Sequence, residues 1–232
     1  VLAVPDASSF QLMNWGEGGE VTGAMFCDLI NLDGTPFEGD PRQVLKRNLN
    51  KARAAGFTLM CAPEVEFFYF AADSLDGPPR PLDSASYFDL TTFDASSDIR
   101  RETIQRLEAT GIPVEYSFHE DAPSQHEIDL RYSDALSMAD NLMSLRLIVR
   151  EVALQHGVHA TFMPKPLAGV QGSGMHTHMS LFAKETNSFF DEDAEAHLSE
   201  TARQFIAGLL RHAPEITACT NQLVNSYKRL VS

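Results

Sequence analysis

The sequence predicts an α+β fold, because strand-like and helix-like segments mix without the regular strand–helix alternation of a doubly wound sheet. Residues 1–33 consist of short alternating runs broken by glycine, and residues 20–30 (EVTGAMFCDLI) have the clearest strand pattern among them. Residues 57–70 are β-branched and aromatic and predict a longer, largely buried strand. Residues 134–157 are apolar enough to predict a helix that is largely buried. We expect a second domain to begin near Gly34, after the first group of strands.

Three further helices are predicted by their start and stop signals. The first covers residues 40–56, where Asp40 is the expected cap, Pro41 lies in the first turn and the last residue is a glycine stop. The second covers residues 96–111 and also ends at a glycine, and the third covers residues 199–215 and begins at a serine cap. The chain neither starts with methionine nor ends on a helix terminus or a turn, so we expect it to be part of a longer protein.

The composition indicates a globular protein that does not bind nucleic acid or an anionic membrane. The 232 residues are 44% hydrophobic and carry a net charge of -14, which would repel both of these polyanions. No run approaches the roughly 18 apolar residues of a membrane span, and the start lacks a signal-peptide pattern, so we expect a cytoplasmic protein. Cys27, Cys61 and Cys219 are widely spaced, which predicts buried free thiols rather than disulfides or a thiolate zinc site.

Two glutamates in the predicted buried strand are the first candidates for chemistry. Successive strand side chains point to opposite faces, so Glu64 and Glu66 share one face while Val65 and Phe67 share the other. A solvated strand face would also explain such a pair. However, like charges raise each other's pKa unless a cation compensates, and the aromatic residues that follow predict burial. A bound metal ion would resolve that conflict.

Two further pairs could supply ligands to the same metal site. Glu120 and Glu127 lie seven residues apart across a Pro/Ser turn that can direct both carboxylates toward one point. His176 and His178 project to the same side of another predicted strand, although packing alone would also explain such a pair. Because the set contains oxygen and imidazole donors but no thiolate, it favours magnesium or manganese over tetrahedral zinc. The glycine-rich residues 169–174 precede the histidines and would let a ligand approach the backbone closely, so the whole set indicates phosphoryl transfer.

The order of these motifs resembles glutamine synthetase of the bacterial type. The matching segments are PEVEFF, HEDAPSQHEIDLRY, ADN, TFMPKP, GSGMHTHMSLF and NSYKRL. The resemblance implies that residues 1–33 are the later part of an N-terminal β-grasp domain. It implies that residues 34–232 are a catalytic domain, incomplete at its C-terminus, built on a curved antiparallel sheet with helices. The implied reaction is ATP-dependent ligation of ammonia to the side-chain carboxylate of glutamate, through a γ-glutamyl phosphate.

The resemblance also implies a role for each site residue. One magnesium or manganese ion would be held by Glu66, Glu120 and Glu127, and a second by Glu64, His176 and a glutamate that lies beyond Ser232. Glutamate would be bound by the Gly172 backbone, His176 and Arg229, of which Arg229 is the expected catalytic residue. ATP would contact Tyr132, His178 and Ser180. The implied assembly is a homododecamer whose active sites form between neighbouring subunits.

Several positions depart from the family pattern without removing a metal ligand. Gln171 stands where many members have Asn, and Phe118, Asp121 and Ser124 stand where HHEVAPGQHE is common. Because the Gln171 loop is expected to contact glutamate, a relative that ligates glutamate to a polyamine or another amine remains an alternative. A non-catalytic homologue with a structural role is the third hypothesis. It is disfavoured because a structural protein has little reason to keep clustered like charges.

Overall fold

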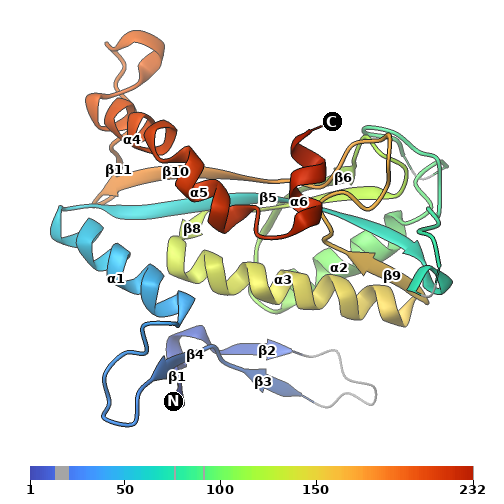
Figure 1. Ribbon diagram of the computed structural model, residues 1–232, viewed down its shortest axis with the longest axis horizontal. Helices are drawn as coiled ribbons and strands as arrows, with labels where there is room; N and C mark the ends of the chain where they lie inside the picture. The colour runs from blue at the N-terminus through green and yellow to red at the C-terminus, as the bar shows by residue number, and fades with distance from the viewer. Residues whose placement is uncertain (14–20, 76, 91, 232) are drawn as a thin grey trace.

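A seven-stranded antiparallel sheet organises the computed structural model, which describes residues 1–13, 21–75, 77–90 and 92–231. The main path of the sheet is β11 (Thr186–Asn187), β10 (Met175–Ala183), β5 (Thr58–Ala71), β7 (Gln125–Leu130) and β6 (Val114–His119). Two short strands, β8 (Ser133–Asp134) and β9 (Val158–Thr161), pair with β5 outside this path. The predicted strand at residues 57–70 is therefore the centre of the sheet, as Figure 1 shows.

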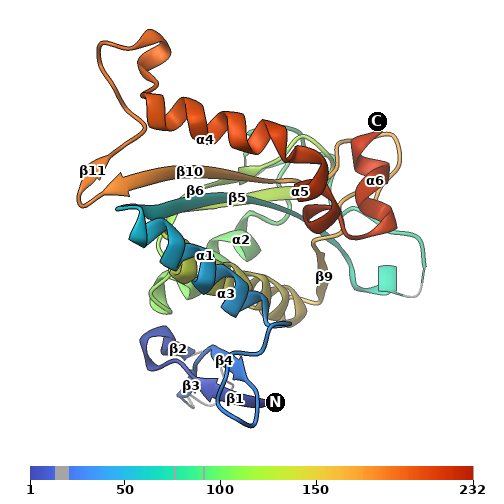
Figure 2. The same cartoon turned by 60° about the vertical axis from the view of Figure 1, so that its left-hand side comes forward.

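Helices cover both faces of this sheet. In Figures 1 and 2, α1 (Pro41–Ala54), α2 (Ser97–Ala109) and α3 (Ala135–Gln155) lie on one face. The opposite side carries α4 (Glu200–Arg211), α5 (Ala213–Thr220) and α6 (Val224–Leu230). The α+β class predicted from the sequence is thus confirmed.

The hydrophobic core lies between the sheet and helices α2 and α3. Val65, Phe67 and Tyr69 on β5 are 3%, 0% and 0% exposed, and they pack with Leu145 and Ile148 of α3. Both the burial of this strand and the burial of the 134–157 helix are confirmed. Because Val65 and Phe67 face the core, the alternation along β5 places its glutamates on the other face.

Local signals predicted the beginnings of helices better than their ends. The Asp40 carboxylate accepts a hydrogen bond from the Arg42 amide at 2.9 Å and caps α1 as expected. The predicted helix at residues 199–215 is instead two helices, α4 and α5, which meet at His212. Pro214 explains the break, because it lacks an amide donor and its ring disfavours a continuing helix. The last segment, for which no helix end was expected, contains α6.

The N-terminal strands form two separate ribbons. β1 (Leu2–Pro5) pairs with β4 (Cys27–Ile30), and β2 (Gln11–Met13) pairs with β3 (Thr22–Ala24). The strand predicted at residues 20–30 is therefore divided into β3 and β4, and its first residue lies outside the described part of the chain. The division arises because the two halves pair with different partners. Short 3-10 turns occur at η1 (Ala7–Ser9), η2 (Ala72–Leu75) and η3 (Glu195–His197).

Arg42 connects these ribbons to the sheet domain. Its guanidinium donates to Asp140 of α3 through Nε at 3.1 Å and Nη2 at 2.9 Å, and to Asp6 at 2.8 Å. It also contacts Asp28 of β4, which accepts from Lys46 at 2.5 Å. The Arg42 side chain is only 10% exposed, so these carboxylates meet a largely buried cation.

Two features bear on expectations about location and cysteine chemistry. Within the described ranges, no helix combines the length and the apolar character that a membrane crossing requires. The three cysteines are free, as predicted, but their expected burial is wrong for Cys219, which is exposed on α5. Cys27 and Cys61 are partly buried.

Candidate active site

Strand register brings the predicted acidic and histidine side chains onto one face of the sheet. Glu66 on β5 is the direct partner of Glu127 on β7, and Glu64 is the direct partner of both Asp129 on β7 and His176 on β10. Directly opposed residues lie on the same face of a sheet. Since Val65 and Phe67 occupy the core face, these polar side chains lie on the face that α2 and α3 leave free.

Glu66 is held by groups from two other segments. Its Oε2 accepts a hydrogen bond from Gln125 Nε2 at 2.9 Å and from the Gly174 amide at 3.0 Å. Gln125 also donates to the Gly172 carbonyl at 3.2 Å, so one amide joins the β7 strand to the glycine-rich loop. Burial raises the pKa of Glu66, despite the hydrogen bond from Gly174. Gln125 was not identified from the sequence, because nothing in its local pattern distinguishes it.

Glu127 is the most perturbed carboxyl group of the site. Burial, followed by its hydrogen bond to Asp129, raises the pKa of Glu127 to about 9. The pKa of Asp129 is also raised, chiefly by burial, and its Oδ1 is buried without a hydrogen-bond partner among the described residues. Glu64, Glu66, Glu127 and Asp129 therefore form a block of four carboxyl groups across two strands. Sequence reasoning missed Asp129, although it follows Glu127 at the same spacing that separates Glu64 from Glu66.

The two histidines of β10 converge on one carboxylate. His176 Nδ1 lies 3.0 Å from Glu64 Oε2, and His178 Nε2 lies 2.5 Å from Glu64 Oε1. The hydrogen bond from His178 lowers the pKa of Glu64, with a further contribution from His176. Both histidine side chains are 70% exposed, so they are open to a ligand rather than packed in a core. The packing explanation for this pair is therefore disfavoured.

A cavity of about 460 Å³ lies beside Glu66 and is lined by the residues predicted to bind glutamate. Its lining includes Glu66, Glu120, Gly172, His176 and Arg229, together with Tyr87, Asp121, Lys165, Gln171 and Gly174. The two positions that depart from the family pattern near the expected substrate, Asp121 and Gln171, thus border this cavity. Its lining thus combines carboxylates with two cationic side chains, Lys165 and Arg229.

Two glycines beside this cavity lie very close to Arg229 and to the Pro164 carbonyl. A Cβ on Gly174 would lie 2.7 Å from Arg229 Nη2, and a Cβ on Gly172 would lie 2.4 Å from the Pro164 carbonyl. Both distances are shorter than side-chain carbons tolerate. Arg229 is carried by α6, and Asn225 of the same helix holds the loop by accepting from the Lys165 amide at 2.7 Å and donating to its carbonyl at 3.0 Å. The helix that sequence analysis did not predict therefore positions the predicted arginine.

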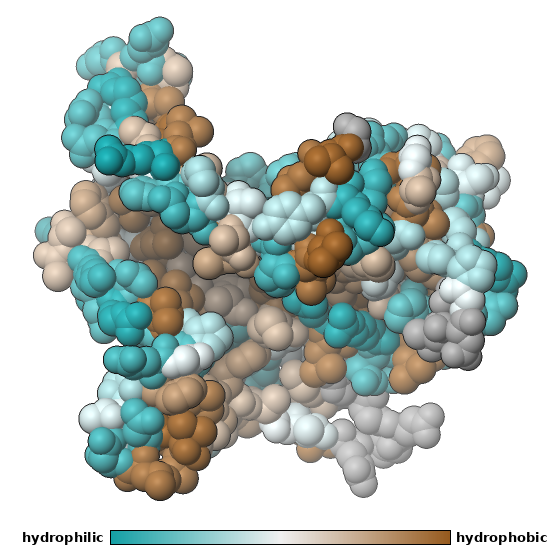
Figure 3. Space-filling view, in the orientation of Figure 1, coloured by the Kyte–Doolittle hydropathy of each residue, from teal (hydrophilic) through white to brown (hydrophobic). Residues whose placement is uncertain are grey.

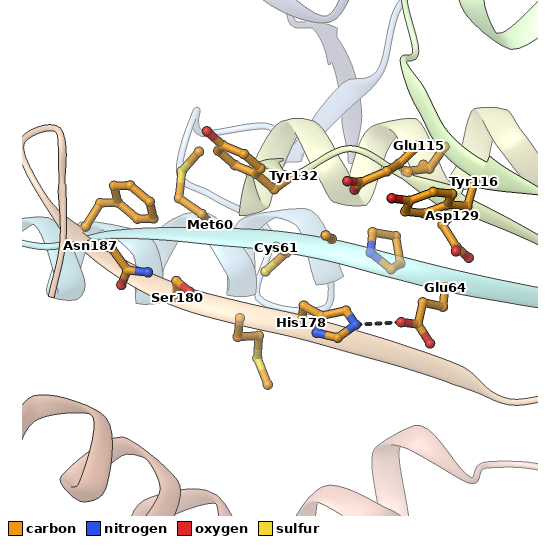
Figure 4. A pocket seen from close by; sticks show the side chains of 15 residues that line it. Met60, Cys61, Glu64, Glu115, Tyr116, Asp129, Tyr132, His178, Ser180 and Asn187 are labelled. Carbon is orange, nitrogen blue, oxygen red and sulfur yellow. Dashed lines mark hydrogen bonds and ion pairs between the residues drawn. The ribbon is translucent and has the colours of Figure 1, made fainter. Parts of the chain in front are cut away.

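A second cavity, of about 480 Å³, lies on the other side of Glu64 and is shown in Figure 4. All three residues predicted to contact ATP line it, namely Tyr132, His178 and Ser180. The Tyr132 ring is 64% exposed and lies parallel to Phe182, with 6.4 Å between the ring centroids. Figure 4 shows the His178–Glu64 contact at the floor of the cavity, with Asp129 nearby.

The donor atoms of this face fit a hard divalent cation. Carboxylate oxygens and imidazole nitrogens are suitable ligands, and the raised pKa values of Glu66 and Glu127 indicate carboxyl groups that lack a compensating positive charge. A separate group, Asp83, Asp94, His119 and His126, has its potential ligand atoms within 4.8 Å of one another. That group lies on the core side of the β6–β7 hairpin and was not predicted.

Comparisons with known proteins agree with this geometry. The family described as "Glutamine synthetase, catalytic domain" matches residues 38–232. The glutamine synthetase of Mycolicibacterium smegmatis is 54% identical over 99% of this chain, and the match covers 52% of that protein. The glutamine synthetase of Halobacterium salinarum is 50% identical over 98% of this chain and 51% of its own length. The chain thus spans about half the length of the curated relatives it matches.

A solved structure shows the same arrangement of elements. The structure described as "Apo GmaS without ligand" superimposes with a TM-score of 0.90 at 36% identity, over 99% of this chain and 54% of that one. The curved antiparallel sheet with helices that the resemblance implied is therefore confirmed. On the family match, the sequence identity and the shared fold together, the chain belongs to the glutamine synthetase family.

Proposed function

We propose that the protein catalyses ATP-dependent ligation of ammonia to glutamate, giving glutamine, ADP and phosphate through a γ-glutamyl phosphate. The observation that carries this proposal is the pair of cavities on one face of the sheet. One is lined by the predicted glutamate-binding residues and the other by the predicted ATP-binding residues. Between them lies the row of carboxyl groups that starts at Glu64 and Glu66. Such a layout would place ATP, the phosphoryl donor, and the side-chain carboxylate of glutamate, the acceptor, on either side of this row.

The carboxyl groups of this row would hold two or more divalent cations, which we assign as magnesium or manganese. Glu66, Glu120 and Glu127 would bind one, while Glu64 and His176 would contribute to the other. When bound, such ions neutralise charge on the phosphoryl group being transferred. The protein's own contribution is to orient these ligands, as Gln125 and the Gly174 amide do for Glu66.

The remaining roles concern substrate positioning. We assign the Gly172 backbone, His176 and Arg229 to glutamate, because a guanidinium can bind a carboxylate with two parallel hydrogen bonds. Arg229 would act as the catalytic residue of this set by holding the substrate in the reactive orientation. Tyr132, His178 and Ser180 are assigned to ATP, with the exposed Tyr132 ring available to an adenine face.

A direct assay of the acceptor amine tests this proposal. With glutamate, ATP and a divalent cation supplied, we expect phosphate release to be stimulated by ammonium more than by putrescine or ethanolamine. Glutamine formation, followed by chromatography, should match the phosphate released. A strong preference for one of the larger amines would instead assign the protein to the amine-ligating relatives and direct attention to Asp121 and Gln171. Absence of turnover with intact cation binding would favour the non-catalytic homologue.

Assembly, location and domain boundaries complete the proposal. We assign residues 1–33 to the later part of a β-grasp domain and residues 34–232 to the catalytic domain, and we place the protein in the cytoplasm. The proposed assembly is a homo-oligomer, specifically a dodecamer. Exposed apolar side chains over the N-terminal ribbons, at the lower edge of Figure 3, support association between subunits. Among them, Leu2, Val4 and Leu32 are 50%, 43% and 82% exposed. Light scattering on the purified protein would measure the assembly size.

A further inference from the structure

A buried polar network lies directly behind the turn that carries Glu120 and Glu127. His119 at the end of β6 and His126 on β7 are cross-strand partners, with their ring centroids 4.9 Å apart. Both are 0% exposed. Each histidine precedes one of the two glutamates in sequence, so the backbone that fixes a histidine also fixes its neighbouring glutamate.

Asp83 binds the turn between β6 and β7 from the core side of the hairpin. Its Oδ1 accepts hydrogen bonds from His119 Nε2 at 3.2 Å, from the Ser124 amide at 2.8 Å and from Ser124 Oγ at 3.2 Å. Ser124 of the turn also binds the Asp83 segment, because its Oγ accepts hydrogen bonds from the Leu82 amide at 2.7 Å and from the Asp83 amide at 3.1 Å. Ser124 has a φ of 58°, which a residue other than glycine adopts only at a cost. These reciprocal bonds therefore fix an otherwise disfavoured turn.

Arg100 of α2 binds the other strand of the hairpin. Its Nη1 donates to His126 Nδ1 at 2.8 Å and forms an ion pair with Asp94 Oδ2, 2.7 Å away. The side chains of Arg100 and Asp94 are 11% and 1% exposed, so this contact lies in the protein interior. It links the start of α2 to the residue beside Glu127.

The same contacts argue against a metal ion inside this network. Arginine can only donate hydrogen bonds, so His126 Nδ1 must accept and the proton of the neutral ring must lie on Nε2. A protonated nitrogen has no lone pair for a metal ion. The Arg100 guanidinium also balances the charge of Asp94 already. Arg100 therefore already supplies a positive charge beside two members of the group Asp83, Asp94, His119 and His126.

We propose that Asp83 and Arg100 are positioning residues for the cation site on the opposite face of the sheet. Asp83 fixes the turn that presents Glu120, and Arg100 fixes the strand that presents Glu127. Neither side chain touches the cation. Both act by restricting the backbone of the hairpin, since ligand groups must be held to within roughly 0.5 Å for a productive site. The inference rests on the proposed cation-dependent function.

Manganese binding by variants of Asp83 and Arg100 tests the proposal. We expect Asp83→Asn and Arg100→Lys each to weaken Mn²⁺ binding by about 10-fold, as is typical when a group supporting a metal ligand is changed. Electron paramagnetic resonance of free Mn²⁺ would give both affinity and stoichiometry. Arg100→Met should weaken binding more than Arg100→Lys, because lysine retains a charge beside Asp94.

A matched control separates positioning from general destabilisation. Asp40 is also a buried aspartate that accepts backbone hydrogen bonds, from Leu29 and Arg42, but it lies far from the hairpin in sequence. We expect Asp40→Asn to lower the melting temperature at least as much as Asp83→Asn while leaving Mn²⁺ affinity unchanged.

Each other result has a defined meaning. Unchanged Mn²⁺ affinity in folded Asp83→Asn and Arg100→Met proteins would overturn the positioning role while leaving the proposed function intact. Loss of one bound Mn²⁺ per chain in Asp83→Asn, without weaker binding of the rest, would show that the buried network is itself a cation site and would also overturn it. Failure of the unmodified protein to bind Mn²⁺ would instead contradict the proposed function.

Discussion

Glu127 has a strongly raised pKa in the folded protein, and this makes a pH dependence testable. Its pKa rises from 4.5 to about 9 in the folded protein. Between these values the folded state therefore holds a proton that the unfolded state releases. Stability from this group is fully present below about pH 4.5 and is lost as pH rises toward about 9.

We expect the free energy of unfolding of the cation-free protein to fall between about pH 5 and about pH 9, because Glu127 resists ionisation in the fold. Urea denaturation with EDTA present would measure it. Glu127→Gln is the matched control, since its neutral amide resembles the protonated acid and should flatten the decline. Equal pH dependence in the two proteins would rule out Glu127 as its source.

Single residues also show how far the site could be predicted. Alternation along β5 was sufficient to place Glu64 and Glu66 on one face, because it depends only on neighbouring residues. Asp129 and Gln125 were missed because their importance lies in cross-strand contacts to Glu64 and Glu66. The alternation of Glu127 and Asp129 indicated a shared face, but it did not reveal their partners on β5.

At the scale of elements, Arg42 is the connection between the N-terminal ribbons, α1 and α3. We expect Arg42→Met to lower the free energy of unfolding by about 3 kcal/mol or more, because it leaves the largely buried Asp140 carboxylate without its cation and leaves Asp6 and Asp28 with Lys46 alone. Chemical denaturation would measure the loss. Arg101→Met is the control: its ion pair with Asp98 is 62% and 78% exposed, and such surface pairs contribute little. A similar loss in both variants would contradict the central role of Arg42.

The C-terminal helices illustrate why boundaries of elements were harder to predict. The sequence predicted one helix over residues 199–215, whereas the chain bends at His212 and a second helix, α5, begins there. The α6 helix is short and has no side-chain cap, and it is held by Asn225 against the Lys165 loop. Its formation depends on that contact more than on local preference, because helices of this length are marginal alone.

For the whole molecule, we expect divalent cations to stabilise the fold. A ligand that binds only the folded state adds about 2.7 kcal/mol at 100 times its dissociation constant. For a chain of this size that corresponds to a rise in melting temperature of about 5–10 °C. Scanning calorimetry with and without saturating Mn²⁺ would measure the shift, and Glu66→Gln should remove the part that comes from the cation held by Glu66, Glu120 and Glu127. A shift as large in Glu66→Gln would place the bound cation elsewhere.

By itself, the sequence determined the fold class, the helix caps, the core face of β5 and the family motifs. Each of these depends on side chains a few residues apart, where backbone geometry fixes which atoms meet. Motif order also predicted one group of residues for glutamate and one for ATP, and each predicted group lines its own cavity.

Only the tertiary structure decided which carboxyl groups lie opposite one another on neighbouring strands and which residues hold them in place. The pairing of β5 with β7 places Asp129 opposite Glu64 and Glu127 opposite Glu66. The network through Asp83 and Arg100 joins residues up to 42 positions apart. Register of this kind is set by packing of the whole sheet against α2 and α3, because a shift of one residue would move Phe67 out of the core. No local pattern carries that information.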